Sequence, residues 1–118
     1  MKTIISGSRD IECYDELLRA IECVDWKPTL VISGCARGAD RLGERWAKEN
    51  NVPVLKMPAD WLSYGRAAGY CRNIAMADQA DALIALWDCK SPGTEHMIEV
   101  AERRGLRIFV KYVSRRGD

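Results

Sequence analysis

The chain has 118 residues, of which 47% are hydrophobic and 30% are charged, and its formal net charge is +1. This length supports one hydrophobic core, so we expect a single domain over residues 1–118. A net charge near zero excludes a global attraction to nucleic acid or anionic membranes, and the basic pair Arg115–Arg116 is too short to change that. No apolar run reaches the roughly 20 residues of a membrane-spanning helix, so we expect a cytoplasmic protein without membrane association.

The cysteines form no Cys-x-x-Cys pair and have no histidine cluster beside them, because His96 is the single histidine. The usual spacing of a zinc site is therefore absent, and we expect neither a metal nor a cofactor. We expect free thiols buried in a reducing cytoplasm, with Cys35 and Cys89 in loops that could be accessible. The five cysteines are Cys13, Cys23, Cys35, Cys71 and Cys89.

Three short strands and two helices are predicted in the first half of the chain. The strands are apolar runs at residues 2–5, 30–33 and 52–57. Between the first two, apolar residues recur at helical spacing over about residues 12–25. Asp40 is predicted to cap the second helix, which carries Leu42 and Trp46 on its core side and ends at Asn50.

Two further helices and two strands complete the pattern. The third helix is predicted roughly over residues 64–79, and six consecutive apolar residues at 82–87 are typical of a strand covered on both faces. The fourth helix begins at Gly93 and is closed by Gly105, and residues 106–112 form the last strand.

Strands that alternate with helices predict an α/β fold, a three-layer sandwich around a five-stranded parallel sheet of order 3-2-1-4-5. This order places a topological switch point between the first and fourth strands. In open α/β sheets, ligands bind outside the carboxyl ends of the strands at such a point. We therefore expect the functional residues in the loops at that edge.

The unusual residues of the chain follow the strands at this edge and suit an anionic ligand. Glycines let backbone N–H groups approach a phosphate, and a helix N-terminus adds unpaired donors. Guanidinium groups match phosphate oxygens, and aspartates accept hydrogen bonds from sugar hydroxyls. The candidates are Gly7, Gly34, Gly93 and Thr94, with Arg9, Arg37, Arg72, Asp40 and Asp88. Their spacing matches neither the dinucleotide-binding GxGxxG pattern nor the P-loop pattern.

Several of these residues also have a structural interpretation. Gly34 and Gly38 suit a tight turn, and Asp60 suits a turn as well. Trp61 and Trp87 follow strands, where each either stacks on a base or packs against the protein. The coincidence of several such loops at one sheet edge favours a binding site.

Four stretches of the chain resemble the SLOG superfamily, and within it the small YspA-type proteins. The superfamily joins the DNA-processing DprA/Smf proteins with the lonely-guy phosphoribohydrolases, and the resemblance implies a Rossmann-like fold and a homo-oligomer. The matching stretches are SGSRD at Ser6–Asp10, ISGCARGADRLGERWA at Ile32–Ala47, PADWLSYGRAAGYCRNIAM at Pro58–Met76 and DALIALWDCKSPGTEHMI at Asp81–Ile98.

The resemblance implies a pocket for a nucleotide-like small molecule, with roles that carry over residue by residue. Ser8 and Arg9 line it, and Arg72 and Asn73 enter from the third helix. A second wall comprises Gly34, Arg37, Gly38 and Asp40. A phosphate is expected at Ser91, Gly93 and Thr94.

Three classes of function follow. The first is binding or sensing of a nucleotide-derived ligand, such as an ADP-ribose-like or cyclic signalling molecule. The second is cleavage of the N-glycosidic bond of nucleoside monophosphates, and the third, single-stranded DNA binding, is disfavoured by the near-neutral charge. The phosphoribohydrolases carry a Gly-Thr-x-x-Glu pattern, but Met97 occupies the glutamate position here. We therefore favour binding and assign no catalytic residue; the sequence identifies neither the base nor the number of phosphates.

Overall fold

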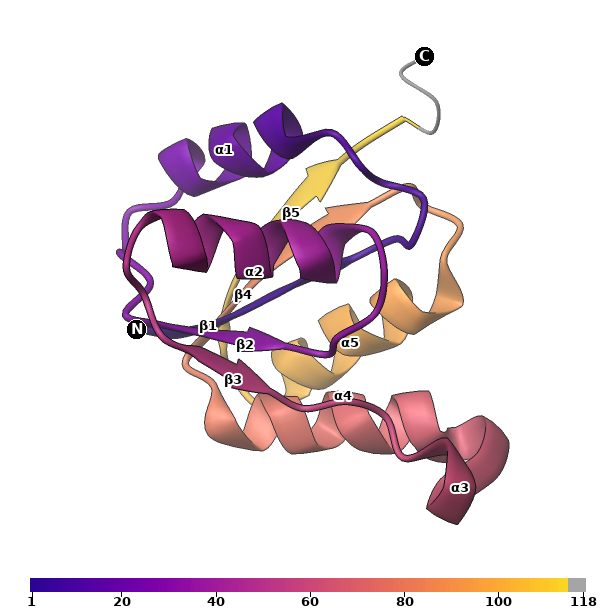
Figure 1. The fold of residues 1–118 in the computed structure, drawn as a ribbon. Coiled ribbons are helices and arrows are strands. Elements are labelled where there is room, and N and C mark those ends of the chain that lie inside the picture. The colour runs from indigo at the N-terminus through magenta and orange to yellow at the C-terminus, as the bar shows by residue number, and fades with distance from the viewer. Residues whose placement is uncertain (115–118) are drawn as a thin grey trace.

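The computed structural model describes residues 1–114, so the basic pair Arg115–Arg116 lies outside the described residues. Within that range, five strands alternate with helices (Figure 1). The strands are β1 (Lys2–Gly7), β2 (Leu30–Ser33), β3 (Val54–Lys56), β4 (Ala82–Trp87) and β5 (Arg107–Tyr112). The helices are α1 (Tyr14–Cys23), α2 (Ala39–Glu49), α3 (Trp61–Tyr64), the 3₁₀ helix η1 (Gly65–Ala67), α4 (Ala68–Gln79) and α5 (Pro92–Arg103).

The strands form one parallel sheet in the order β3-β2-β1-β4-β5, which confirms the predicted topology. At its centre, Ile4 of β1 is in register with Ile32 of β2 and with Leu83 of β4. Residues Ala82–Leu86 of β4 are fully buried, because neighbouring strands and helices surround them. The parallel order brings the carboxyl ends of all five strands to one edge.

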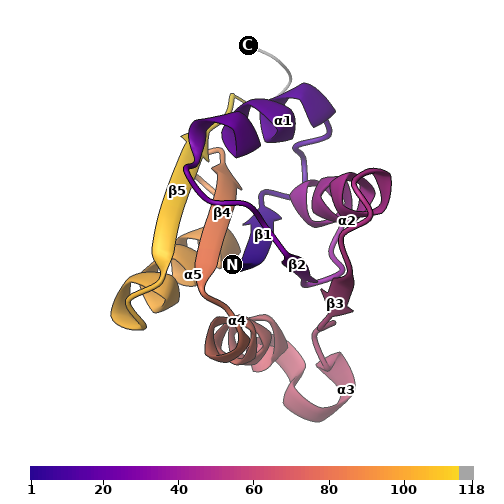
Figure 2. The ribbon, with the colours of Figure 1, turned by 90° about the vertical axis from the view of Figure 1, so that its left-hand side faces the viewer.

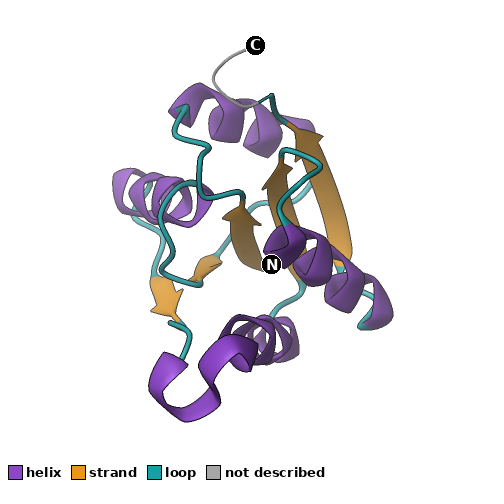
Figure 3. Ribbon diagram, turned by 90° about the vertical axis from the view of Figure 1, so that its right-hand side faces the viewer, coloured by secondary structure: helices purple, strands orange, loops and turns teal. Residues whose placement is uncertain are grey.

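Helices cover both faces of the sheet, α1 and α2 on one and α4 and α5 on the other (Figures 2 and 3). Successive strand residues point to opposite faces, so Ile4 and Ile5 enter different hydrophobic clusters. The cluster beneath α1 and α2 includes Leu17 and Trp46, which confirms the predicted core position of this tryptophan. The cluster beneath α4 and α5 includes Met97.

The predicted third helix is wrong in its first part, because the structure divides this segment into α3, η1 and α4. The carboxylate of Asp60 accepts a hydrogen bond from the backbone N–H of Ser63. Asp60 is therefore the N-cap of α3, which follows the loop after β3. Gly65 ends α3 with a φ of +55° and a ψ of −130°, a conformation that L residues rarely adopt. The long helix α4 therefore begins only at Ala68, after η1.

The prediction that Asp40 caps the second helix is also wrong. The N-cap of α2 is Gly38, which makes no side-chain hydrogen bond, and Asp40 lies inside the first turn. The carboxylate of Asp40 instead accepts a hydrogen bond from the backbone N–H of Ala36, so it fixes the preceding loop. The predicted bounds of β2 and β4 are confirmed, and the remaining boundaries differ from the prediction by at most two residues, at strand and helix ends where fraying is common.

The general expectation of buried thiols is wrong as well, whereas the accessibility expected of the loop residue Cys89 is confirmed. All five cysteines are free, and four of them, Cys13, Cys23, Cys71 and Cys89, are exposed. Cys35 is partly buried. Among residues 1–114, no helix has the length and apolar character needed to span a membrane.

Candidate ligand-binding cleft

A cleft of about 440 Å³ opens at the carboxyl edge of the sheet, within the size range of small-molecule sites. Loops after β1, β2 and β4 and the first turns of α4 line it. Ten of the thirteen predicted site residues line this cleft: Gly7, Ser8, Arg9, Arg37, Asp40, Arg72, Asn73, Ser91, Gly93 and Thr94.

A second cavity of about 550 Å³ adjoins the first and contains an eleventh predicted residue, Gly34. Its lining also includes Cys35, Pro58 and Ala59, from the loops after β2 and β3. The two cavities adjoin, because five residues line both: Arg9, Ala36, Arg37, Trp61 and Arg72. The two remaining predicted residues, Gly38 and Asp88, line neither cavity.

Gly38 shapes the cleft by letting two loops pack closely. Its φ is +79°, and a Cβ atom there would lie 2.5 Å from the carbonyl oxygen of Arg9 and 2.6 Å from that of Ser8. The next residue, Ala39, donates its backbone N–H to the Ser8 carbonyl at 3.4 Å. Gly38 therefore lets the loop after β2 pack closely against the backbone of the loop after β1.

Asp88 shapes the loop between β4 and α5. Its Oδ1 atom accepts hydrogen bonds from the backbone N–H groups of Lys90 at 2.9 Å and Ser91 at 2.8 Å. Burial raises the pKa of Asp88, but hydrogen bonds from Lys90, Ser91 and Ser8 outweigh it and hold the pKa at about 2. The backbone N–H of Asp88 in turn donates to the Ser8 hydroxyl at 3.2 Å. Asp88 thus stays ionised and ties two cleft loops together.

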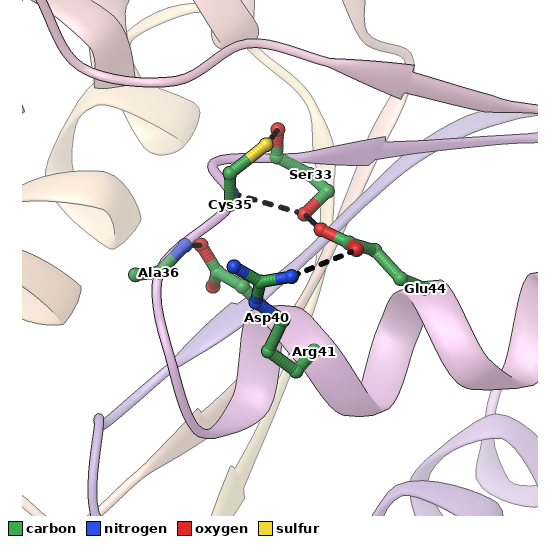
Figure 4. A network of polar contacts seen from close by, with 6 residues as sticks. All are labelled: Ser33, Cys35, Ala36, Asp40, Arg41 and Glu44. Carbon is green, nitrogen blue, oxygen red and sulfur yellow. Dashed lines mark hydrogen bonds and ion pairs between the residues drawn. The ribbon is translucent and has the colours of Figure 1, made fainter.

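Asp40 is the buried carboxyl group of the cleft, with 4% of its surface exposed. Burial raises its pKa to about 6, against the opposing effects of the hydrogen bond from Ala36 and the charges of Arg72 and Arg9. A carboxyl group with this pKa exchanges protons near neutral pH, which is a property suited to proton transfer. Figure 4 shows Asp40 beneath the loop that Ala36 belongs to.

The neighbouring polar network holds this loop from the other side (Figure 4). The hydroxyl of Ser33 donates to Glu44 at 2.6 Å and accepts from the backbone N–H of Cys35 at 3.1 Å. Arg41 forms an ion pair with Glu44 at 3.8 Å. Cys35 has a φ of +64°, unusual for a residue other than glycine, and these hydrogen bonds fix it in that conformation.

Arg72 connects α4 with the loop after β2. Its Nη1 atom donates to the carbonyl oxygen of Gly34 at 2.6 Å, and its Nε atom donates to Asn73 at 3.2 Å. Burial lowers the pKa of Arg72, yet a guanidinium stays protonated in proteins. Asn73 then reaches α5, donating to the carbonyl oxygen of Gly93 at 3.1 Å. Arg72 is therefore a structural bridge as well as a cleft residue.

Arg9 and Arg37 have more freedom, since both are exposed. Arg37 lies 3.9 Å from Asp10, and the two side chains are 75% and 51% exposed, so solvent screens this ion pair strongly. Both guanidinium groups remain accessible to an incoming anion.

The N-terminus of α5 forms the opposite part of the lining. Pro92 occupies the first turn and lacks an N–H group, and the N-cap Ser91 makes no side-chain cap hydrogen bond. A Cβ atom at Gly93 would meet nothing within 4 Å, so the space beside this helix start is open. Thr94 is buried but still lines the cleft. The arrangement leaves room for an anion at the positive end of a helix of three turns.

Several residues that line the cleft were not predicted as site residues, among them Arg66, Tyr70 and Asp10. Tyr70 lies three residues before Asn73 on α4, a spacing that places side chains on one helix face and could have identified it. Arg66 lies in η1, which the sequence did not separate from the helix. Trp61 also lines the cleft with 53% of its surface exposed, whereas Trp87 packs against Tyr112 with ring centroids 6.1 Å apart.

The model of the YspA, cpYpsA-related SLOG family matches residues 1–64, which include β1, β2, β3, the loops carrying Arg9 and Arg37, and α2 with Asp40 in its first turn. The chain belongs to this SLOG family. A relative is the Gene 61 protein of Mycobacterium phage D29, which is 36% identical over 86 residues, covering 68% of this chain and 69% of the phage protein. No solved structure matches the chain.

Membership of the SLOG family indicates a nucleotide-related function, either binding or phosphoribohydrolase-like chemistry. The SLOG chain differs from the Gly-Thr-x-x-Glu pattern of the phosphoribohydrolases at the glutamate position. Met97, at the position of the pattern's glutamate, is 0% exposed and packs in the cluster beneath α4 and α5. A glutamate at this position would place a carboxylate in the hydrophobic core.

Proposed function

We propose that the protein binds a phosphorylated, nucleotide-derived ligand at the carboxyl edge of its sheet. The observation that carries the proposal is the gathering of Arg9, Arg37, Arg66 and Arg72 with the open start of α5 around one cleft. Two carboxylates, Asp10 and Asp40, are the acidic groups of that lining, so the balance of formal charge favours an anion.

Aromatic side chains support a nucleotide over inorganic phosphate. Trp61 and Tyr70 line the same cleft and are 53% and 47% exposed, so both rings offer a face or edge to a ligand. Base stacking on an aromatic ring contributes about 1–3 kcal/mol. A nucleotide uses both the cationic and the aromatic parts of the lining.

Isothermal titration calorimetry with a panel of nucleotides tests the proposal. Arg9→Ala and Arg37→Ala should each weaken binding of a phosphorylated ligand by about 1.5–3 kcal/mol, since each removes a charge-assisted hydrogen bond. Both residues are exposed, so we expect thermal stability to be unchanged. Arg19→Ala is the matched control, because Arg19 lies on α1 and pairs only with Glu16 among the ion pairs of residues 1–114. Unchanged affinity in both cleft variants would place the site elsewhere.

Cleavage of an N-glycosidic bond is a second candidate, and Asp40 is the observation that favours it. A carboxyl group in the cleft with a pKa of about 6 is suited to general acid catalysis. Such hydrolysis also needs a group that stabilises an oxocarbenium-like transition state or activates water, and Met97 is unable to do so.

We therefore expect no release of free base from nucleoside monophosphates above the uncatalysed rate. Chromatography of reaction mixtures with the wild-type protein measures this directly. Base release by the wild type that disappears in Asp40→Asn would establish the hydrolase and contradict simple binding.

A further inference from the structure

A chain of hydrogen bonds links the loop after β2 with α5. Arg72 donates from its Nη1 atom to the Gly34 carbonyl and from its Nε atom to the Oδ1 atom of Asn73. The Nδ2 atom of Asn73 donates to the Gly93 carbonyl at 3.1 Å and lies 3.1 Å from the Nδ1 atom of His96. His96 lines neither cavity, so this chain begins at the cleft and ends outside it.

The neighbours of the Asn73 amide determine which way it points. The Nε–H of Arg72 only donates, so the amide oxygen faces it, and the Gly93 carbonyl only accepts, so the amide nitrogen faces that. One of the two hydrogens on this nitrogen is used by Gly93, and the other is available to the Nδ1 atom of His96. That atom therefore accepts a hydrogen bond, which makes the ring neutral with its proton on Nε2.

The same imidazole ring packs against Tyr70, an aromatic side chain of the cleft. The two ring centroids are 4.3 Å apart, with an interplanar angle of 40°. Tyr70 lies three residues before Asn73 on α4, so the two side chains share one face of that helix. His96 thus contacts two cleft residues from outside, and a movement of its ring alters the position of both.

Protonation of His96 is incompatible with this arrangement. An imidazolium carries a hydrogen on each ring nitrogen, so Nδ1 would present a hydrogen to the Asn73 amide hydrogen. The amide is unable to reverse without losing its bonds to Arg72 and Gly93. The imidazolium ring must therefore leave this position, and its contact with Tyr70 is lost.

The surroundings of His96 favour the neutral ring. Burial lowers the pKa of His96 from its ordinary value of 6.5, the charge of Glu99 opposes this effect, and the charge of Arg103 adds to it. Both charged residues lie on α5 itself. From the other elements that pack against α5, α4 contributes Tyr70 and Asn73, and within residues 1–114 the strands contribute no charge that shifts this pKa.

We propose that His96 is a positioning residue of the cleft, which as a neutral ring holds Asn73 and Tyr70 in place and on protonation releases them. This inference rests on the proposed nucleotide-binding function and adds regulation by pH to that site. A ligand that requires the organised cleft favours the neutral ring, so ligand and proton oppose each other through His96. The affinity for a nucleotide should therefore fall as the pH is lowered through the range in which His96 titrates.

NMR of the untagged chain tests the hydrogen bond directly, because His96 is its single histidine. Long-range ¹H–¹⁵N correlation spectra should show the tautomer protonated on Nε2 at about pH 8. Asn73→Ala should raise the midpoint of the histidine titration, since it removes a donor that stabilises the neutral ring. A ring protonated mainly on Nδ1 at this pH, or an unchanged midpoint in Asn73→Ala, would overturn the proposal.

Calorimetric titration with adenosine monophosphate and ADP-ribose tests the effect on the cleft. His96→Asn keeps a side-chain acceptor without a titrating group, and asparagine has a helix propensity close to that of histidine. It should bind each probe within about twofold of wild type at about pH 8, and at least about threefold more tightly than wild type at about pH 5. Titration of Asp40 and of the probe phosphate is common to both proteins, so the ratio of their affinities isolates His96.

Glu99→Gln is the matched variant on the same helix. Glu99 is exposed and lines neither cavity, and its charge raises the pKa of His96. The variant should lower the midpoint of the histidine titration and move the loss of affinity to lower pH by the same amount. A midpoint that moves without any change in the affinity profile would show that His96 does not act on the cleft.

The outcomes separate this proposal from the proposed function. Equal pH profiles of wild type and His96→Asn would overturn the positioning role and leave nucleotide binding intact. A wild type that binds more tightly than His96→Asn at low pH would also overturn it, because a direct attraction between imidazolium and phosphate has that effect. Failure of both probes and of every other nucleotide in the panel to bind the wild type at about pH 8 would overturn both proposals.

Discussion

Burial of the Asp40 carboxyl group in the cleft wall destabilises the folded state when this group is ionised. The structure places its carboxyl group in a cleft wall with 4% exposure, where burial raises its pKa from 3.8 to about 6. The folded protein therefore binds a proton at Asp40 more tightly than the unfolded chain does. Protonation of Asp40 therefore stabilises the folded state at low pH, and this stabilisation is lost between pH 3.8 and about 6 as the pH rises.

Asp40→Asn should remove this pH dependence. A pKa rise from 3.8 to about 6 corresponds to roughly 3 kcal/mol, so the free energy of unfolding of the variant should gain about 2–3 kcal/mol relative to wild type between pH 4 and pH 7.5. Urea denaturation of both proteins at the two pH values measures the difference. A constant offset between them at both values would show that Asp40 titrates normally.

At the scale of elements, the sheet order could be predicted from the sequence, but the segment between β3 and α4 could not. Alternating apolar runs and helical periodicity leave few topologies for a chain of this length, and right-handed crossovers fix the order. The break at Gly65 depends on its positive φ, which helical periodicity does not reveal. Arg66, which follows this break and lines the cleft, was therefore not predicted as a site residue. Asp40 was predicted as the N-cap of α2, but it lies inside the first turn of that helix.

The contact between the loops after β1 and β2 gives a prediction at this scale. Gly38→Ala should destabilise the protein strongly, because the new Cβ would lie 2.5 Å from the Arg9 carbonyl oxygen, on backbone that has little room to move. Gly105→Ala is the matched control, with a φ of +70° close to the +79° of Gly38 but nothing within 4 Å of its Cβ.

Strain alone should cost the control about 1–2 kcal/mol, and Gly38→Ala should cost clearly more because the clash adds to the strain. Thermal denaturation of the two variants measures both losses. Equal losses would show that the close approach of the two loops contributes nothing to stability.

At the scale of the whole molecule, we propose that the chain forms a homo-oligomer, as the family resemblance implies. Several large apolar side chains on α3 and α4 are exposed, namely Trp61, Leu62, Tyr64, Tyr70 and Ile74, and Leu62 is 102% exposed. Clustered exposed apolar groups commonly mark interaction surfaces. Light scattering should give at least twice the 13.3 kDa mass of one chain, and a species of 13.3 kDa alone at all concentrations would refute the oligomer.

The molecule as a whole separates its scaffold from its cleft. The two hydrophobic clusters lie between the sheet and its helices, while arginines, aspartates and open backbone gather at the carboxyl edge. The opposite edge carries the turn at residues 25–28 and takes no part in either cavity. A nucleotide-derived ligand should therefore change the chemical environment of residues at the carboxyl edge of the sheet and leave that of the opposite edge unchanged.

Chemical-shift mapping of the backbone amides during a nucleotide titration tests this central claim most directly. We predict that the largest changes occur at residues 7–9, 34–37 and 93–94, which line the cavities, and that residues 25–27 at the opposite edge stay unchanged. Arg19→Ala protein should give the same map as wild type. Changes concentrated at the opposite edge, or none with any nucleotide of the panel, would contradict a nucleotide-binding cleft at the carboxyl ends of the strands.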